Sequence, residues 1–414
     1  MAKIDDSVKK KVPELRFKGF TDEWEERKLG EVFNQTVEYI NPNEANLELW
    51  SVTVERGLTP KTARYNREAL VKKNDKFKVV HDGDIVYNPM NLTIGAVGFN
   101  KSEKSVAVSG YYVTMNMNSG FNNSYFQTWL KSENAIKQYK LYATGSLIEK
   151  QRVQFPTLSL IKSYIPTFEE QQKIGSFFKQ LDNSIALHQR KLDLLKEQKK
   201  GYLQKMFPKN GEKVPELRFA GFADDWEERK LGDIAPLRGG FAFKSSKFRN
   251  TGVPIVRISN ILSSGDVGGD FAYYDEQDKD DKYILPDKSA VLAMSGATTG
   301  KVSILSQTDY DKVYQNQRVG YFQSVENIDY GFISTIVRSE LFVMQLDSVL
   351  VSGAQPNVSS KEIDSFNFMI PILVQEQQKI GAFFKKIDDT IALHQRKLDL
   401  LKEQKKGFLQ KMFV

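Results

Sequence analysis

The densest group of side chains suited to base recognition is Gln315-Asn316-Gln317-Arg318. Arginine and lysine match the O6 and N7 acceptors of guanine, and asparagine and glutamine match N6 and N7 of adenine. Taken singly, such a side chain is more often a phosphate contact or a solvated residue than a base contact. The candidate DNA-binding residues are Arg64, Tyr65, Arg67, Asn88, Asn91, Thr93, Tyr111, Tyr112, Lys150 and Arg152 in the first half, and Arg238, Lys244, Lys247, Arg257, Asn260, Thr298, Lys301, Gln315, Asn316, Gln317, Arg318, Gln355 and Asn357 in the second.

Three motifs resemble catalytic or cofactor sites but lack required residues. Residues 87–90 (YNPM) have one proline where the N-P-P-aromatic loop of adenine methyltransferases has two, so we expect a turn. Residues 296–302 (GATTGKV) have three residues between the glycines and a valine where a phosphate loop has Ser or Thr, although a backbone nest near a DNA phosphate stays possible. The acidic run 275–281 lacks the glycine and terminal glutamate of a calcium loop, so we expect a solvated loop. We therefore predict no catalytic residue and no metal site.

The composition narrows the classes of function. The chain has no cysteine and three histidines, which removes thiolate chemistry and leaves little for a histidine-based site. The sequence begins without an apolar signal segment, and none of its apolar windows is long enough to cross a membrane. We therefore expect a cytoplasmic protein without membrane contact. The net charge is +7, and residues 1–207 hold 32 Lys and Arg against 24 Asp and Glu, while residues 208–414 hold 27 against 28. Phosphate binding and ordinary solubility both explain this excess.

These candidate residues are flanked by a duplicated segment. Residues 185–201 and 391–407 share the sequence IALHQRKLDLLKEQKKG, and both copies continue to LQKMF after one changed residue. Apolar positions recur with steps of 4 and 3, which predicts a long coiled-coil helix in each half. Thr167 and Glu170 have the spacing of a capping box at the start of the first helix. The predicted seam is Ile174, Phe178, Leu181, Ile185, His188, Leu192 and Leu195 in the first helix, and Ile380, Phe384, Ile387, Ile391, His394, Leu398 and Leu401 in the second.

A second repeat, the opener, begins each half. Residues 11–32 (KVPELRFKGFTDEWEERKLGEV) match residues 213–234 (KVPELRFAGFADDWEERKLGDI). We expect a short packing element in which Trp24 and Trp226 are buried. The turn-rich segment 208–212 is expected to link the halves.

The region between opener and helix differs between the halves. Short β-branched runs alternate with Gly, Asn and Ser clusters, which predicts strands at 77–80, 85–87, 106–108, 255–258, 291–294 and 313–314. Helices are predicted at 124–142 and 331–349. Each variable region is therefore an α+β domain of ordinary size. The predicted segments are a first domain at 1–167, a helix at 168–207, a second domain at 208–373 and a helix at 374–414.

The repeats resemble those of the specificity subunit of Type I restriction–modification enzymes. The resemblance rests on PELRF and WEERKLG in the openers, SGATTGK (295–301), SGAQPNVS (352–359), the helix starts EEQQKIG and QEQQKIG, and the helix ends KKGYLQKMF and KKGFLQKMF. It covers nearly the whole chain. In TGSLIEKQ (144–151) the Q-P-N of the second-half loop is missing, so the first domain departs from the pattern there.

The resemblance implies an α+β fold with two globular target-recognition domains joined by two long antiparallel coiled-coil helices in a pseudo-two-fold arrangement. Each domain would recognise one half of a bipartite site in double-stranded DNA, and the helices would set the spacing. The implied partners are two methyltransferase subunits and motor–nuclease subunits. No cofactor would bind this chain directly, because S-adenosylmethionine, ATP and magnesium would be held by those subunits.

Two other functions fit parts of the sequence. A coiled-coil scaffold whose variable domains bind protein would lack the steep salt dependence of phosphate binding. A self-sufficient methyltransferase would need the missing methyl-donor loop. His188 and His394 also have two interpretations, since each is either a tolerated polar position or part of a polar layer that sets the helix register.

Overall fold

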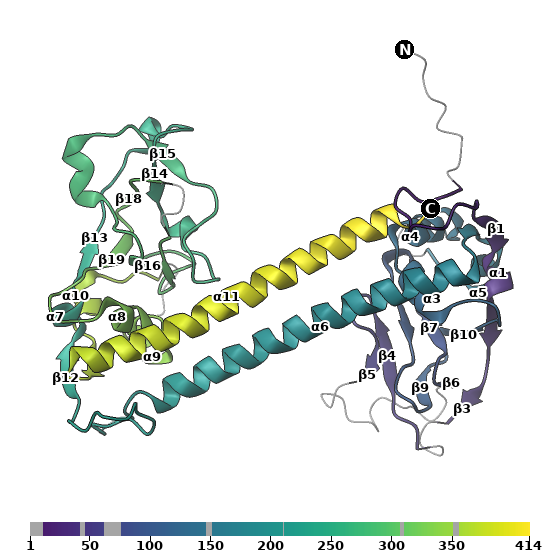
Figure 1. The fold of residues 1–414 in the computed structure, drawn as a ribbon, viewed down its shortest axis with the longest axis horizontal. Helices are drawn as coiled ribbons and strands as arrows, with labels where there is room; N and C mark the ends of the chain where they lie inside the picture. Colours follow the sequence, from purple (N-terminus) through teal and green to yellow (C-terminus); the bar gives the residue numbers. More distant parts are fainter. Residues whose placement is uncertain are drawn as a thin grey trace, which may run out of the picture. The chain divides into compact units, whose positions relative to one another are not determined.

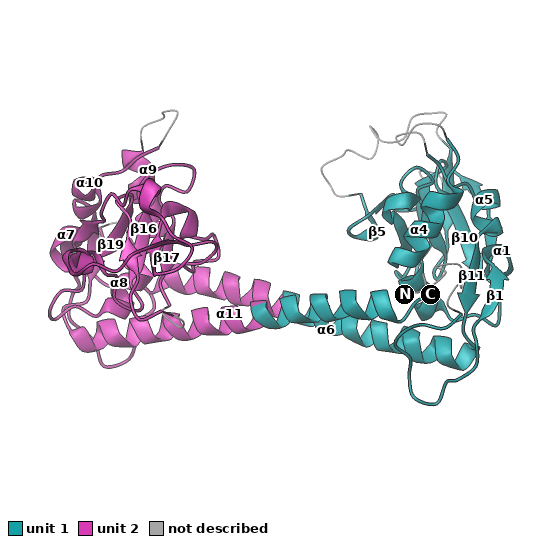
Figure 2. Ribbon diagram, turned by 90° about the horizontal axis from the view of Figure 1, so that it is seen from above, with its two compact units in different colours: residues 1–189, 396–414 teal, residues 190–395 magenta. Residues whose placement is uncertain are grey.

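The computed structural model describes residues 11–41, 46–61, 76–145, 151–209, 211–306, 310–350 and 356–414. The chain forms two compact units. Unit 1 holds residues 1–189 together with 396–414, and unit 2 holds residues 190–395 (Figure 2). Each unit therefore contains the start of one long helix and the end of the other. The helical segments predicted at 168–207 and 374–414 are each divided between the units.

Unit 1 contains a mixed set of strands and helices (Figure 1). In chain order these are β1 (Glu25–Lys28), α1 (Leu29–Val32), β2 (Phe33–Thr36), β3 (Tyr39–Ile40), β4 (Trp50–Thr53), β5 (Gly57–Pro60), β6 (Phe77–Val80), β7 (Ile85–Tyr87), β8 (Val97–Phe99), β9 (Val106–Ser109), β10 (Val113–Met117), α3 (Asn123–Trp129), α4 (Glu133–Tyr142), α5 (Phe155–Leu160), β11 (Lys162–Ile165) and the first part of α6 (Phe168–Lys205).

Unit 2 follows the same plan. Its elements are β12 (Glu227–Lys230), α7 (Leu231–Ile234), β13 (Leu237–Gly239), β14 (Val253–Val256), β15 (Ala272–Tyr274), β16 (Ala290–Ala293), β17 (Val302–Ile304), β18 (Tyr314–Gln315), β19 (Val319–Phe322), α8 (Tyr330–Ile336), α9 (Glu340–Val349), α10 (Ser360–Asp364), β20 (Asn367–Ile370) and the first part of α11 (Val374–Lys411). Short 3-10 turns lie between the strands, among them η5 (Asp278–Tyr283).

The central sheets of the two units have the same topology. The strand order is β2-β10-β7-β8 in unit 1 and β13-β19-β16-β17 in unit 2, with antiparallel pairing throughout. The opener strand pairs in both units with the strand before the long helix, as β1 with β11 and β12 with β20. The duplication therefore extends through the variable regions, and the α+β prediction is confirmed.

Most predicted elements exist, but several have different boundaries. The strands predicted at 77–80 and 85–87 are β6 and β7, whereas β14 begins earlier than predicted and Ile258 lies in a 3-10 turn. The helix predicted at 124–142 is broken into α3 and α4, because Ser132 caps a new helix by accepting from the Ala135 N–H. Ser339 breaks the helix predicted at 331–349 in the same way.

The long helices α6 and α11 each have 38 residues. In unit 1 the start of α6 packs against the end of α11, with the rings of Phe177 and Phe408 4.9 Å apart. In unit 2 the end of α6 packs against the start of α11, with Tyr202 and Phe383 5.0 Å apart. The helices therefore pair antiparallel. All predicted seam residues are buried or partly buried, His188 and His394 being partly buried. No helix in the described parts of the chain is long and apolar enough to cross a membrane.

The end of each helix completes a core. Met412 and Phe413 are buried in the core of unit 1, where the ring of Phe413 stacks on Phe178 at 5.7 Å. Met206 and Phe207 are buried in the core of unit 2. The last residues of the second long helix therefore belong to the unit formed mainly by residues 1–189.

Candidate nucleic-acid interface

Three loops lie at equivalent places in the two units. One links β7 to β8 and β16 to β17. The second links β9 to β10 and β18 to β19. The third precedes α5 and α10. Val113 pairs with Tyr87 as Val319 pairs with Ala293, which fixes the equivalence of the second loop. Most candidate residues that the structure describes lie in these loops.

In unit 2 the loops are bound to one another. Asn357 bridges to Ser295, the Met294 N–H donates to the Arg318 carbonyl at 3.0 Å, and Thr299 Oγ1 donates to the Pro356 carbonyl at 2.9 Å. The structure thus brings together Thr298, Lys301, Asn316, Gln317, Arg318 and Asn357. The turn at 298–301 is closed by the Lys301 N–H donating to the Thr298 carbonyl. The side chains of the second and third loops also meet, since Arg318 Nη1 donates to Asn357 Oδ1 at 3.5 Å.

The first unit gathers its candidates in the same way. The Val153 N–H donates to the Pro89 carbonyl at 3.0 Å, which places Arg152 beside the loop that holds Asn88 and Asn91. The Met90 N–H donates to Asn88 Oδ1 at 3.1 Å, so residues 87–90 form the expected turn. Tyr111 and Tyr112 lie on the adjoining β9–β10 loop.

Exposure separates the candidates. Asn91, Tyr111, Arg152, Lys244, Lys247, Lys301, Gln317, Arg318 and Asn357 are exposed, while Asn88, Tyr112, Arg238, Arg257, Thr298 and Asn316 are partly buried. Lys244 precedes the 3-10 turn Ser245–Lys247 that follows β13, and Lys247 is its last residue. Arg64, Tyr65, Arg67, Lys150 and Gln355 lie outside the described residues.

Three residues predicted to contact DNA have side chains that face the interior, so the prediction is corrected for Gln315, Asn260 and Thr93. Gln315 has no exposed surface, and its amide donates to the carbonyls of Arg238 and Val319. Asn260 is 1% exposed, and its amide donates to the carbonyls of Gly268 and Asp270. Thr93 is buried in the turn between β7 and β8. These side chains hold loops in place and do not present hydrogen-bonding groups to a base.

Two predicted cations are also engaged inside unit 2. The guanidinium of Arg238 donates to Gln315 Oε1 and to the carbonyls of Lys282 and Ile284, and burial lowers its pKa. Arg257 donates to the Asp270 carbonyl at 3.1 Å. The acidic run at 275–281 is not fully solvated as predicted, because it enters the 3-10 turn η5 and Asp280 is 3% exposed.

Sequence reasoning missed two residues beside these loops. Lys78 lies in the buried strand β6, and its ammonium donates to the Tyr112 carbonyl at 2.7 Å. Phe241 is 38% exposed next to the β18–β19 loop, where its N–H donates to the Gln315 carbonyl and its ring stacks on Tyr283. A lysine inside the apolar run FKVV and a phenylalanine after paired glycines were the available signals.

The openers anchor the helix starts through buried ion pairs. Arg16 binds both carboxylate oxygens of Glu170 at 2.6 and 2.7 Å, and Trp24 Nε1 donates to the same carboxylate at 3.1 Å. Thr167 Oγ1 accepts from the Glu170 N–H at 3.4 Å, so only half of the predicted capping box forms. The tryptophans are buried as predicted, Trp24 at 3% and Trp226 at 2% exposed.

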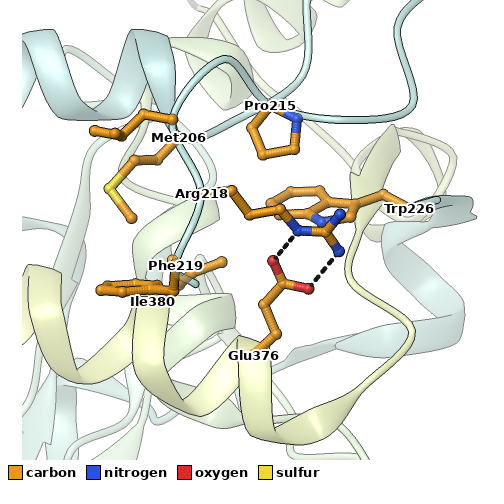
Figure 3. A pocket seen from close by; sticks show the side chains of 8 residues that line it. Met206, Pro215, Arg218, Phe219, Trp226, Glu376 and Ile380 are labelled. Carbon is orange, nitrogen blue, oxygen red and sulfur yellow. Dashed lines mark hydrogen bonds and ion pairs between the residues drawn. The ribbon is translucent and has the colours of Figure 1, made fainter. Parts of the chain in front are cut away.

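Unit 2 repeats this ion pair between Arg218 and Glu376, at 2.7 and 2.8 Å (Figure 3). Met206, Trp226 and Ile380 surround the pair and leave no space for a water molecule. Each opener also contacts the long helix that ends in its own unit. In unit 2 the Leu217 N–H donates to the Lys205 carbonyl of α6 at 2.8 Å, and in unit 1 the Leu15 N–H donates to the Lys411 carbonyl of α11 at 2.9 Å. The pocket drawn in Figure 3 is therefore the place where the opener meets the start of α11 and the end of α6, and it is filled by their side chains.

The helix-start motif QQKIG has a structural role in both units. Gln171 Oε1 accepts from the Asn122 N–H and Gln377 Oε1 from the Asp329 N–H, each at the start of the helix packed against it. Gly175 and Gly381 allow the backbones of α3 and α8 to approach closely. Within the described residues, no three His, Asp or Glu side chains are grouped as a metal site would require.

Comparisons with known proteins agree with this duplicated architecture. The family model of the Type I restriction modification DNA specificity domain matches residues 21–197 and again residues 223–403. The chain is 25% identical over 349 residues to the Type I restriction enzyme MjaVIII specificity subunit of Methanocaldococcus jannaschii, covering 82% of this chain and 80% of that protein. It is 25% identical over 258 residues to the EcoAI specificity subunit of Escherichia coli, covering 61% and 41%. The crystal structure of a Type I restriction–modification S subunit from M. genitalium has a TM-score of 0.64 at 14% identity, covering 97% of this chain and 99% of that one.

Proposed function

Because the chain belongs to the family of Type I restriction–modification specificity subunits and contains two DNA specificity domains, we propose that each unit binds one half of a split DNA site through its three equivalent loops. One observation carries this proposal. The central sheets, the opener strand pairs and the contacts at the helix starts are equivalent in the two units, while the exposed loop side chains differ. Tyr111 and Tyr112 in unit 1 occupy the loop that holds Gln317 and Arg318 in unit 2. One scaffold with two different sets of polar side chains suits two different half-sites.

The chain itself acts by binding, and the chemistry belongs to other subunits. The motif at 87–90 is a turn closed by Asn88, and the motif at 296–301 packs against Pro356. Methylation of adenine would then require methyltransferase subunits that hold S-adenosylmethionine, and DNA cleavage would require motor–nuclease subunits that use ATP and magnesium. The absence of cysteine suits a cytoplasmic complex.

The exposed leucines of the long helices support docking of two methyltransferase subunits. Leu187 and Leu194 are seven residues apart on α6, and Leu393 and Leu400 occupy the same positions of the identical segment on α11. Their exposed fractions are 47%, 54%, 65% and 50%. Residues seven apart lie on one face of a helix. Two identical methyltransferase subunits need two equivalent docking surfaces, and the identical segments of α6 and α11 provide them.

Partner stoichiometry tests this docking. The native chain is expected to bind two methyltransferase subunits. Replacing Leu187 and Leu194 with arginine should remove one of them, since two charges on the apolar face oppose its burial. The double variant at Leu393 and Leu400 should remove the other. Two subunits bound to both variants would refute docking at these leucines.

DNA recognition is tested by salt and by modification. Binding through several phosphates should weaken steeply between low and moderate salt, whereas a protein-binding scaffold would show no such DNA binding. In cells, loss of this chain should abolish adenine modification at one split motif. Unchanged modification would refute the proposed function.

The length of the helices is proposed to set the unread gap between half-sites. Each helix of 38 residues measures about 57 Å at about 1.5 Å per residue. Deleting one heptad from both helices preserves the seam and shortens each helix by about 10 Å. The gap in the recognised motif should then shorten. An unchanged gap would show that other features determine it.

A further inference from the structure

We propose that Lys78 in unit 1 and the pair Arg238–Gln315 in unit 2 are positioning residues that fix the reading loops and so determine which bases each half-site contains. The reading loops are Ser109–Tyr112 and Gln315–Arg318, which occupy equivalent places before β10 and β19. The inference rests on the proposed DNA recognition and concerns the residues behind the contact surface.

The amide of Gln315 has a single possible orientation. Its Nε2 donates to the Arg238 carbonyl at 2.8 Å and to the Val319 carbonyl at 2.7 Å. Its Oε1 accepts from Arg238 Nε at 3.1 Å and from a terminal guanidinium nitrogen at 2.9 Å. A flipped amide would point its donors at the guanidinium and its oxygen at two carbonyls. The side chain is fully buried, so these bonds are not exchanged for bonds to bulk water.

The remaining contacts of Arg238 extend the support. Its terminal nitrogens donate to the carbonyls of Lys282 and Ile284, and its guanidinium lies 5.0 Å from the centre of the Tyr321 ring. The neighbouring Gly240 lies directly against the reading loop, where a Cβ atom would collide with the carbonyl oxygens of Gln315 and Asn316. The reading loop is thus supported by Arg238 on β13 and by the adjoining Gly240, while Gln317 and Arg318 remain exposed.

Unit 1 supports the equivalent loop with a different side chain. Lys78 is 5% exposed, and its ammonium donates to the Tyr112 carbonyl at 2.7 Å and lies 5.7 Å from the centre of the Tyr39 ring. A charged donor forms a stronger hydrogen bond than a neutral one, and more so away from water. In unit 1 a buried cation from β6 therefore holds the backbone of the reading loop, whereas in unit 2 a partly buried cation from β13 fixes the side chain of Gln315, the first residue of the reading loop.

Fixed loop backbones matter because base recognition is geometric. A well-placed bidentate contact discriminates between bases by roughly 5- to 150-fold. That discrimination requires the donor and acceptor atoms to keep their places relative to the base edge. A loop without its internal support would keep its polar side chains and lose their alignment.

The experiment is selection of duplexes from a randomised DNA pool by the full chain together with its methyltransferase subunits. Lys78→Met keeps the side-chain stem and removes the ammonium, and Gln315→Leu keeps the volume and removes the amide. The first variant should lose base preference in one half-site by roughly 5- to 150-fold at the affected positions, and the second variant should do so in the other half-site only. The dependence of binding on salt should stay unchanged, since neither side chain is placed at a phosphate.

Matched controls use the same substitutions elsewhere. Lys162→Met removes an exposed lysine that pairs with Glu26 on β1. Gln345→Leu removes a glutamine whose amide bonds both backbone groups of Asn367. Both controls should select the native motif. Should Lys78→Met or Gln315→Leu unfold, Lys78→Gln removes the charge but keeps a polar side chain, and Gln315→Glu removes the amide donors but keeps the acceptors; each should weaken the base preference of its own half-site.

The outcomes separate the two proposals. A native complex that selects no motif refutes DNA recognition itself. A native complex that selects a split motif, with folded Lys78 and Gln315 variants that select the same motif equally well, overturns the positioning role. Equal loss in both half-sites from either single variant also overturns it, because each residue supports one loop only.

Discussion

Single glycines decide how closely the long helices approach the recognition domains. A Cβ atom at Gly381 would lie 2.7 Å from the Phe332 nitrogen, and one at Gly175 would lie 2.6 Å from the Tyr125 nitrogen. Real Cβ atoms do not approach backbone so closely, so the helices would have to separate. These positions therefore require glycine for space and not for an unusual backbone angle.

Gly381→Ala should lower the free energy of unfolding by about 1–3 kcal/mol, the usual effect of overpacking against backbone. Gly407 on the same helix is the control, since a Cβ atom there meets nothing within 4 Å. Gly407→Ala should raise the free energy of unfolding by about 0.5–1 kcal/mol. Urea denaturation measures both, and equal effects would contradict the close-packing argument.

Lys78 should make stability depend on pH in the alkaline range. Burial lowers the pKa of its ammonium below the usual value, which is about 10.4 in unfolded chains. Below the folded-state pKa both states hold the proton, and stability does not change. Between the folded and unfolded pKa values the unfolded state binds more protons, so stability rises with pH. The free energy of unfolding of the native chain should therefore rise relative to that of Lys78→Met as pH increases from neutral toward about 10. A constant difference would be the contrary result.

The suitability of residues 315–318 for hydrogen bonds to bases could be predicted from the sequence. Which of the four side chains are buried and which are exposed could not. The sequence places four polar side chains in a row, and each has hydrogen-bonding groups suited to bases. The structure turns Gln315 inward because β18 ends there and pairs with the buried strand β14. Such burial depends on pairing with residues about 60 positions earlier in the chain, which local residue pattern does not encode.

At the scale of elements, the openers and the helix starts depend on each other. Glu170 has no exposed side-chain surface, and Arg16 is 14% exposed. Removing one partner of a buried ion pair leaves the other without compensation, which costs about 3–5 kcal/mol. Arg16→Met should therefore destabilise the chain strongly, and Arg218→Met should do the same through Glu376.

A double-mutant cycle checks this expectation. The variant with both Arg16→Met and Glu170→Met should be more stable than Arg16→Met alone, because no charge is then left buried. Urea denaturation of the native chain, both single variants and the double variant gives the coupling. Simple additivity of the two single changes would show that the contact contributes nothing.

Long elements were more predictable than short ones. The heptad seam extends over many turns, so its periodicity identifies α6 and α11 nearly to their ends. The breaks between α3 and α4 and between α8 and α9 were missed, because one serine side chain that accepts from a backbone N–H outweighs a continuing apolar pattern. The sheet order also escaped prediction, since it depends on pairing between distant segments.

At the scale of the molecule, the two compact units are interleaved along the chain. Phe413→Ala should destabilise unit 1, where its ring contacts Phe178 and Tyr125 at 5.7 and 5.6 Å. The expected loss is about 3–5 kcal/mol, as for other buried aromatic side chains. Hydrogen exchange should quicken in α3, nearly 290 residues earlier in the sequence.

Phe207→Ala is the matched change for unit 2. Its ring stacks on Phe332 at 5.8 Å, so exchange should quicken in α8 and remain slow in α3. Faster exchange confined to the mutated helix end in either variant would contradict the division of the chain into these units.

The interleaving also orders the events of synthesis. Residues 190–395, which form unit 2, have all been translated before the ribosome reaches the segment 396–414 that completes unit 1. Until Phe413 emerges, Phe178 and Tyr125 lack the ring that covers them. Domains of most chains become complete in the order in which they are made. In this protein the unit whose translation begins first is the last to be complete.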